Sequence, residues 1–490
     1  MDRLSRGIPR AGTVFLSGVL RRSVFARLVA LAAMLAGAPA HAAILYWSGN
    51  GSSQGGNGTW DTTSVHFGSS STGPYSTIWN NTTNAADTAL FGGSTATATL
   101  GTNITVRGVT FNNASTVAGG GFSLTTGGAS NLTVAAGGVG RGTGGTISAP
   151  IVGSGGLSIS NTAGPIVLTG SSTYSGTTII GAAVSGVPIR LNLGNGGATG
   201  SIGSSSGLRV DAGSVFATNR SGTITQGVNF PLINGGGEYI KNGVGTAIFT
   251  LTNGYSGATT VSAGSLEMGD GGTTGSLGAS SSISVSNNAA FAVNRSNNVT
   301  QASSGGAFRA ITGAGEFHQV GSGTTTLALA NSYTGPTRVS GGALKITGTL
   351  AATAITVEPF AILGGTGTTA GDVTFEPDSM FLFDAAAPLN VGGSVTFSDP
   401  ASFGVDDIIG LDSSVDEGTY TLIAGNVTTT NLANLGSSNA YDLGSGKSAY
   451  FQQGSLQVVV VPEPASLAAT AAGAVAIAIA LRRRRTYPVG

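Results

Sequence analysis

Apolar residues recur in short alternating runs along most of this chain. Runs such as Ile166-Val167-Leu168 and Ile248-Phe249-Thr250-Leu251 follow a period of two. Gly, Asn and Ser interrupt such runs about every 8–12 residues, which predicts short β-strands joined by turns. Residues that favour helices are scarce between the two ends of the chain, where Gly, Ser, Thr, Asn and Val dominate. The pattern therefore predicts an all-β protein.

Two repeats overlie this alternation. Residues 194–226 match residues 269–301 at a constant offset of 75. A shorter block occurs three times, around Tyr174, Tyr255 and Tyr333, and reads STYSGTTII, NGYSGATTV and NSYTGPTRV. The three tyrosines are 81 and 78 residues apart, which exceeds one supersecondary unit, so each period must contain several strands.

Short strands in a repeat array stack most simply as a right-handed parallel β-helix (β-solenoid), with about 20–25 residues per coil. A β-sandwich array is the alternative. In the β-helix, Leu168, Leu251 and Leu329, which precede the three blocks, are predicted to be equivalent inward-facing residues. Arg220 and Arg295 recur at the longer period and are predicted to bond turn carbonyls or to face solvent.

The short block resembles the autotransporter-associated β-strand repeat, in which an apolar strand precedes N-x-Y-[ST]-G-x-T-x-[VI] and G-x-L follows. The resemblance implies a β-helix, and the motif residues are Tyr174, Gly176, Tyr255, Gly257, Tyr333 and Gly335. Upstream, the segments around Trp47, Trp60 and Trp79 resemble the N-terminal part of such proteins. We expect the tryptophans to close the first coil, because the open end of a β-helix exposes strand edges. A stacking platform for sugar rings is the alternative.

The N-terminus has the order of a secretory signal peptide, predicted over residues 1–42. Six arginines precede the apolar segment Leu28–Ala36, and Ala-x-Ala sites follow at residues 38–40 and 40–42. A basic region, an apolar region and small residues in this order mark an exported chain.

The C-terminus combines a short motif, an uncharged run and a basic end. The motif consists of Val461, Pro462, Glu463 and Pro464. Seventeen uncharged residues, 465–481, then form a predicted transmembrane helix, and the basic stop after it consists of Arg482, Arg483, Arg484 and Arg485. This order resembles the bacterial PEP-CTERM sorting signal. The resemblance implies recognition by an exosortase-type processing enzyme, attachment to the inner membrane before processing, and then delivery to the cell surface or extracellular matrix. An ordinary membrane anchor is the alternative.

Charge changes the picture of possible partners. Residues 43–461 contain 11 Lys and Arg but 19 Asp and Glu, and 12 of these acids lie between Glu358 and Asp442. Nucleic acid needs the opposite sign, so no nucleic acid partner is predicted. The chain has no cysteine, which excludes disulfides and thiolate chemistry.

Candidate chemistry is sparse. No carboxylate pair, nucleophile–base arrangement or His-containing metal spacing stands out, so no catalytic residue, cofactor or metal site is predicted. One acidic group invites a calcium hypothesis, although a solvated acidic loop is the preferred interpretation. Its members are Asp406, Asp407, Asp412, Asp416 and Glu417.

The predicted organisation places a Trp-containing cap and first coils at 43–150, the repeats at 151–350, an acidic closing β module at 351–460 and the sorting signal at 461–490. The predicted function is a structural or adhesin-like surface protein, not an enzyme, associated with extracellular polysaccharide. The alternatives are a carbohydrate-active enzyme (polysaccharide lyase or hydrolase) on a β-helix and a self-assembling surface-layer subunit.

Overall fold

The computed structural model describes residues 42–463, apart from residues 122, 127–131, 137–143, 163, 204, 278–281, 428–430 and 453–455. Two compact units are distinguished, Met1–Ala43 and Ile44–Gly490, and the fold below is that of the second. Its described residues form β-strands and turns, with three single-turn 3-10 helices and no α-helix, which confirms the all-β prediction. The predicted signal peptide up to residue 41, Pro464, the span 465–481 and the four terminal arginines lie outside the described residues.

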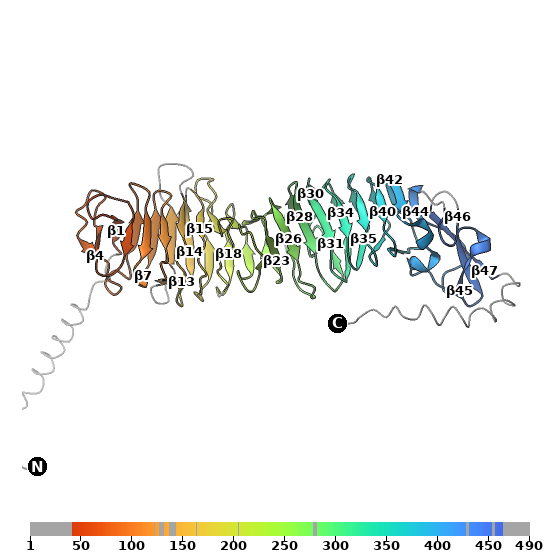
Figure 1. Ribbon diagram of the computed structural model, residues 1–490, viewed down its shortest axis with the longest axis horizontal. Helices are drawn as coiled ribbons and strands as arrows, with labels where there is room; N and C mark the ends of the chain where they lie inside the picture. The colour runs from red at the N-terminus through yellow and green to blue at the C-terminus, as the bar shows by residue number, and fades with distance from the viewer. Residues whose placement is uncertain are drawn as a thin grey trace, which may run out of the picture. The chain divides into compact units, whose positions relative to one another are not determined.

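The strands form five sheets, numbered I to V here (Figure 1). Sheet I runs in the spatial order β24 (Gly254–Tyr255), β21 (Ile233–Gly235), β18 (Leu208–Val210), β16 (Thr178–Ile180), β14 (Leu157–Thr162), β11 (Leu132–Ala136), β8 (Gly108–Phe111), β5 (Thr88–Phe91), β1 (Ile44–Trp47), β3 (Val65–Gly68) and β4 (Thr77–Ile78). Sheet II contains β2 (Gly58–Trp60), β6 (Thr97–Leu100), β9 (Thr116–Ala118), β12 (Gly145–Ile147), β15 (Ile166–Leu168), β17 (Arg190–Leu193), β19 (Val215–Thr218), β22 (Glu238–Lys241), β25 (Thr259–Val261), β27 (Ile283–Val285) and β30 (Ile311–Gly313).

Sheet III contains β20 (Ile224–Thr225), β23 (Thr246–Phe249), β26 (Gly264–Met268), β28 (Ala289–Val293), β31 (Glu316–Gln319), β34 (Thr337–Val339), β37 (Ile355–Val357), β40 (Val373–Phe375), β42 (Leu389–Phe397), β44 (Gly418–Val427), β47 (Leu456–Pro462), β46 (Lys447–Gln452) and β45 (Tyr441–Gly444), joined by β33 (Ala330–Asn331), β36 (Thr349–Leu350) and β39 (Thr368–Thr369). Sheet IV contains β29 (Val299–Thr300), β32 (Thr324–Leu327), β35 (Ala343–Ile346), β38 (Ile362–Gly364), β41 (Met380–Leu382) and β43 (Ile408–Ile409). Sheet V contains β13 (Ile151–Val152), β10 (Leu124–Thr126) and β7 (Ile104–Val106), and the 3-10 helices are Pro400–Ser402, Val405–Asp407 and Ser437–Asn439.

The chain winds through three sheets in turn. Strands β18, β19 and β20 lie in sheets I, II and III, and β21, β22 and β23 return to the same sheets in the same order. Consecutive coils pair in parallel, with Thr178 opposite Leu208 thirty residues later and Ile355 opposite Val373 eighteen residues later. The predicted parallel β-helix is confirmed and the β-sandwich array is wrong, although coil length varies more than expected. The right-handed winding stays a prediction.

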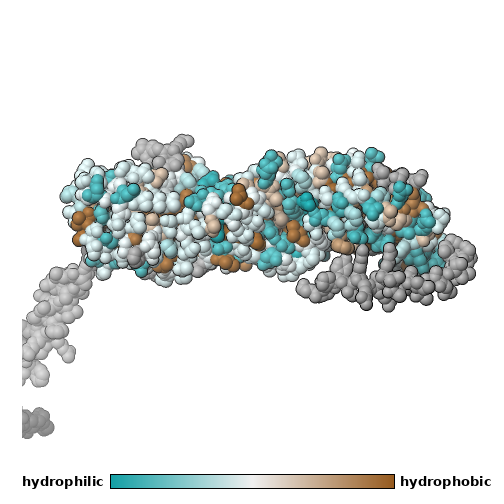
Figure 2. Space-filling view, in the orientation of Figure 1, coloured by the Kyte–Doolittle hydropathy of each residue, from teal (hydrophilic) through white to brown (hydrophobic). Residues whose placement is uncertain are grey.

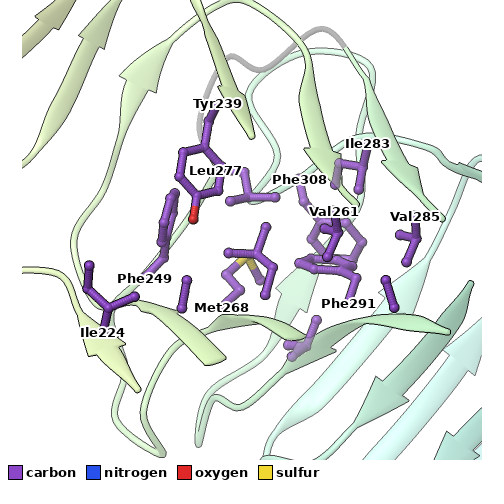
Figure 3. Close-up of a cluster of buried hydrophobic side chains, with 14 of the residues drawn as sticks. Ile224, Tyr239, Phe249, Val261, Met268, Leu277, Ile283, Val285, Phe291 and Phe308 are labelled. Carbon is purple, nitrogen blue, oxygen red and sulfur yellow. The ribbon is translucent and has the colours of Figure 1, made fainter. Parts of the chain in front are cut away.

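Inward-facing apolar side chains from successive coils stack on one another between the sheets. Phe291 lies opposite Phe317 in sheet III, and both side chains are fully buried. Tyr239 of β22 and Phe249 of β23 come from consecutive strands in different sheets. Their ring centroids are 4.8 Å apart (Figure 3). Burying one such side chain contributes roughly 1.5–3 kcal/mol to folding, so the core accumulates stability coil by coil.

Equivalent strands of successive repeats do not lie in the same sheet. The strand that follows Tyr174 is β16 in sheet I, the one that follows Tyr255 is β25 in sheet II, and the one that follows Tyr333 is β34 in sheet III. The longer repeat shifts in the same way, because Arg220 follows β19 of sheet II and Arg295 follows β28 of sheet III. Each repeat is therefore displaced by one sheet relative to the previous repeat. Equivalent side chains lie on different sides of the solenoid.

One predicted equivalence is wrong. Leu168 is buried, but Leu251 is 36% exposed and Leu329 is only half-buried. The inward residues that correspond to Leu168 are Phe249 and Leu327, each fully buried six positions before the repeat tyrosine. Leu251 and Leu329 lie two residues further on, beyond the end of the strand.

Antiparallel strands occur at both ends of the described solenoid. At the N-terminal end, β3 pairs antiparallel with β1 and β4, next to an aromatic cluster that includes Trp47, Trp60 and Trp79. All three tryptophans are fully buried, so a stacking platform for sugar rings is wrong. At the other end, β44, β47, β46 and β45 form an antiparallel meander.

Candidate functional surface

The repeat tyrosines are buried hydrogen-bonding residues. The hydroxyl groups of Tyr174 and Thr178 are 2.6 Å apart, and the distance is 2.7 Å both for Tyr255 with Thr259 and for Tyr333 with Thr337. Burial raises the pKa of Tyr174 and Tyr333 well above the usual value, because the charged phenolate would lose its hydration. The spacing Y-x-x-x-T therefore satisfies a polar group inside the core.

The repeat glycines allow close contact between coils. A Cβ atom on Gly176 would lie 2.3 Å from the backbone nitrogen of Gly156, and one on Gly257 would lie 2.2 Å from the carbonyl oxygen of Gly237. Gly335 repeats this relationship with the carbonyl oxygen of Gly315, at 2.3 Å. Only glycine fits at these positions, so the structure gives the motif residues a packing role.

Both repeat arginines bond turn carbonyls, as predicted. Arg220 donates from Nη1 to the carbonyl oxygen of Gly200 at 3.1 Å and from Nη2 to that of Ala198. Arg295 donates from Nη1 to the carbonyl oxygen of Gly275 at 2.7 Å and from Nη2 to that of Thr273. Partial burial lowers the pKa of both guanidinium groups. These contacts account for the recurrence of the two arginines in structural terms.

A buried lysine closes the following turn. Lys241 is 1% exposed, and its Nζ donates to the carbonyl oxygens of Gly243 and, at 3.2 Å, Ala263. Burial lowers the pKa of its ammonium group to about 8. Gln319 occupies the corresponding position 78 residues later and donates to the carbonyl oxygen of Gly321 at 2.7 Å. The sequence analysis did not identify Lys241 and Gln319. Each is the last residue of the equivalent strand in its repeat, β22 and β31.

Charged side chains gather on the outer face of sheet III. His318 Nε2 lies 2.7 Å from a carboxylate oxygen of Glu316, and His318 lies opposite Arg338 on the next coil. Arg338 forms an ion pair with Glu358. Partial burial would raise the pKa of Glu358, but hydrogen bonds from Arg338 and Ser340 outweigh it and lower the pKa. This surface consists of paired charges, which is the pattern of a solvated face.

The acidic group that suggested calcium is used in local turns. Asp407 accepts a hydrogen bond from the Gly404 amide at 2.8 Å, and Asp412 accepts one from the Ser414 amide at 2.8 Å. The backbone carbonyl of Asp416 accepts a hydrogen bond from the Tyr420 hydroxyl at 2.9 Å. Among the residues that the structure describes, no three His, Cys, Asp or Glu side chains gather closely enough to hold a metal ion.

An open pocket of about 390 Å³ lies at the C-terminal meander. It is lined by Leu435, Gly436, Tyr450, Phe451 and Gln452. These residues carry no ionisable group except the Tyr450 phenol, so the pocket offers apolar, amide and phenol contacts.

The first part of the predicted sorting motif is strand. Val461 and Pro462 end β47, where Val461 lies opposite Ser448 and Pro462 lies opposite Lys447. Strand β47 therefore extends through the first two residues of the motif. The Glu463 amide still donates to the carbonyl oxygen of Gly446 at 2.8 Å. No helix within the described part of the chain is long and apolar enough to cross a membrane.

Comparison with known proteins agrees with the repeat architecture. Residues 163–184, 240–268 and 317–346 match the passenger-associated-transport-repeat family. Three stretches of the chain are therefore similar to this repeat. Each matched stretch contains one of the buried repeat tyrosines, Tyr174, Tyr255 or Tyr333. The resemblance of the short block to an autotransporter-associated repeat is thereby confirmed.

A second similarity concerns a named adhesin. The chain is 32% identical over 226 residues to the Adhesin BmaC autotransporter of Brucella suis biovar 1 (strain 1330), and the match covers 44% of this chain. The chain spans 6% of the length of that relative. No solved structure matches the chain.

Proposed function

We propose that this protein is an exported, adhesin-like structural protein of the cell surface. The observation that carries the proposal is a parallel solenoid built from passenger-type repeats, together with a 226-residue similarity to an autotransporter adhesin. The repeat arginines and Lys241 hydrogen-bond to turn carbonyls, which suits a rigid display scaffold and not a reaction centre.

The finer part of the proposal concerns sorting. We propose that the residues from Val461 onward act as a PEP-CTERM signal, with processing by an exosortase-type enzyme and retention in extracellular polysaccharide. The support is the sequence order of motif, uncharged run and four arginines. The acidic surface favours neutral or cationic polymers over acidic ones as partners.

Surface display is tested by proteinase treatment of intact producing cells, followed by detection of the chain. Loss of the protein under conditions that spare a cytoplasmic marker supports display, and full protection would contradict it. Replacing Arg482–Arg485 by Ser should leave the solenoid unchanged and abolish normal delivery, because the span loses its orientation signal. Normal delivery of that variant would refute the sorting proposal alone.

Adhesion is tested by comparing a deletion strain with strains complemented by the wild-type chain or by a core variant, Phe249→Asp. Retention on glycan arrays, with and without calcium, identifies polysaccharide ligands. Equal adhesion and equal polysaccharide retention by all three strains would contradict the adhesin-like function.

A further inference from the structure

A turn near the C-terminal end of the solenoid holds an exposed aromatic residue in an unusual backbone conformation. Gly342, Phe360 and Asp378 are each the third residue after strands β34, β37 and β40, and their φ angles are +53°, +66° and +62°. The left-handed region suits Gly and tolerates Asp, but it is costly for a bulky residue. Phe360 is nevertheless 55% exposed at this position. The turn therefore displays a phenyl ring at a site where local stability favours a small or polar residue.

Phe360 borders an apolar area on the outer face of sheet IV. Alternation along β38, β41 and β43 directs Leu363, Phe381 and Ile408 inward, where each is buried. The intervening residues face outward, and Ile362 lies opposite Met380 while Leu382 lies opposite Ile409. We call this area the sheet IV patch. It comprises Phe360, Ile362, Met380, Leu382 and Ile409.

The patch is a local feature of the last coils. On the preceding strand β35, Ala343 and Lys345 occupy the positions opposite Ile362 and Gly364. Ile409 is 37% exposed, and the three central residues are half-buried. A contiguous, partly exposed apolar area with a polar border is typical of an interaction site, and aromatic residues are common among those that carry binding energy.

Acidic residues border the patch. Asp378 and Asp384 flank β41 at two residues' distance, and Asp407 and Asp412 flank β43. Lys345 Nζ lies 3.7 Å from Asp384 Oδ2 and offsets one of these charges. Acid still predominates, because from residue 351 to 461 the chain has 12 acidic residues and one basic residue, Lys447. On the face shown in Figure 2, hydrophilic residues are denser over the C-terminal half of the solenoid than over the N-terminal half. The border of a matching partner must therefore be cationic.

We propose that the sheet IV patch is the docking surface for a cationic amphipathic segment of a partner protein. Apolar side chains of that segment cover the patch, and its Lys or Arg residues contact the acidic border. One such cation stacks on the Phe360 ring. A second copy of this chain is not the partner in a face-to-face arrangement, because two acidic borders would meet. The adhesin-like function does not specify this partner. The docking proposal can therefore be refuted without refuting the adhesin-like function.

The test uses the purified full chain and three labelled synthetic peptides of equal length. One alternates Leu and Lys, one alternates Leu and Glu, and one alternates Ser and Lys. Fluorescence anisotropy measures their binding at low and high salt. We expect the Leu/Lys peptide to bind, to weaken with salt, and to bind at least about tenfold more tightly than the other two.

Phe360→Asn is the decisive variant. Asn tolerates a positive φ, so this variant should melt at the same or a higher temperature while it binds the Leu/Lys peptide about tenfold more weakly. Val244→Ser is the matched control, since Val244 is 76% exposed outside the patch and its loss should not affect binding. Met380→Ser tests the centre of the patch independently and should also weaken binding. Equal binding by wild type and both patch variants, binding of the Leu/Glu peptide as strong as that of Leu/Lys, or no binding at all would overturn the proposal.

Discussion

The side-chain amides of Gln226 and Asn253 hydrogen-bond to each other in both directions. Gln226 Nε2 donates to Asn253 Oδ1 at 2.6 Å, and Asn253 Nδ2 donates to Gln226 Oε1 at 3.2 Å. The pair also satisfies backbone groups, because Asn253 Oδ1 accepts from the Ile233 amide and Gln226 Oε1 accepts from the Leu251 amide, both at 3.0 Å. Asn253 Nδ2 further donates to the carbonyl oxygen of Ser276 on the next coil. One buried pair thus ties three consecutive coils together.

The same pair recurs as Gln301 and Asn331, at 2.7 and 3.1 Å. We predict that Asn253→Leu destabilises the solenoid by about 2–4 kcal/mol, because the buried Gln226 amide and the backbone groups of Ile233, Leu251 and Ser276 each lose a hydrogen bond. Hydrogen–deuterium exchange of the coils around Ile233 and Ser276 measures the loss. Asn253→Ser is the control, since Ser172 stands at this place in the first repeat and bonds the Ile151 amide at 3.1 Å. Equal exchange in wild type and Asn253→Leu would contradict a coil-linking role.

A second prediction separates two neighbouring apolar residues. Phe249→Asp should cost about 5 kcal/mol and unfold the surrounding coils, because it removes a fully buried ring and leaves an unpaired carboxylate. Leu251→Asp should change stability by less than about 1 kcal/mol, because Leu251 is partly exposed. Limited proteolysis and thermal melting distinguish the two. A comparable loss in both variants would place Leu251 in the core after all.

Phe249 and Leu251 also show which part of the fold the sequence cannot predict, namely where a strand ends. The alternation in residues 246–251 predicts a strand and its inward parity correctly, but parity alone does not say where the strand ends. Strand β23 ends at Phe249, and Leu251 lies in the turn that Gln226 fixes from the preceding coil. That contact is non-local, so the pattern along the chain cannot reveal it.

The sequence also does not reveal that equivalent strands of successive repeats lie in different sheets. The spacings between Tyr174, Tyr255 and Tyr333 are plain in the sequence, but coil lengths between 18 and 30 residues decide on which sheet each copy lies. The roles of Arg220 and Arg295 could be predicted, because recurrence among turn residues points to structure. Phe360 could not be singled out, since its positive φ and exposure depend on the coils on either side.

A third prediction concerns the close approach at the repeat glycines. Gly257→Ala should destabilise the protein by about 2–3 kcal/mol, because the new methyl group would meet the Gly237 carbonyl oxygen of the preceding coil. Gly222→Ala is the matched control, since its Cβ would meet nothing within 4 Å. Thermal melting of the two variants gives the comparison. A Gly257→Ala variant as stable as Gly222→Ala would show that the coils shift apart at little cost.

The last prediction uses the lowered pKa of Lys241. A folded-state pKa of about 8, below the unfolded value of 10.5, means that the unfolded chain binds more protons between these values. Stability should therefore rise as the pH increases from 8 towards 10.5, and below pH 8 the full cost of burying the ammonium group is present. Each unit of difference in pKa corresponds to about 1.4 kcal/mol, so the total rise is on the order of 2–3 kcal/mol. Urea denaturation at pH 7.5, 8.5 and 9.5 measures it, and comparison with a Lys241 variant removes the opposing contribution of the buried tyrosines, which ionise more readily in the unfolded chain. Lys241→Gln carries the side chain that Gln319 provides in the next repeat, so it should fold normally and lack this rise. A rise of equal size in Lys241→Gln would assign the pH dependence to other groups.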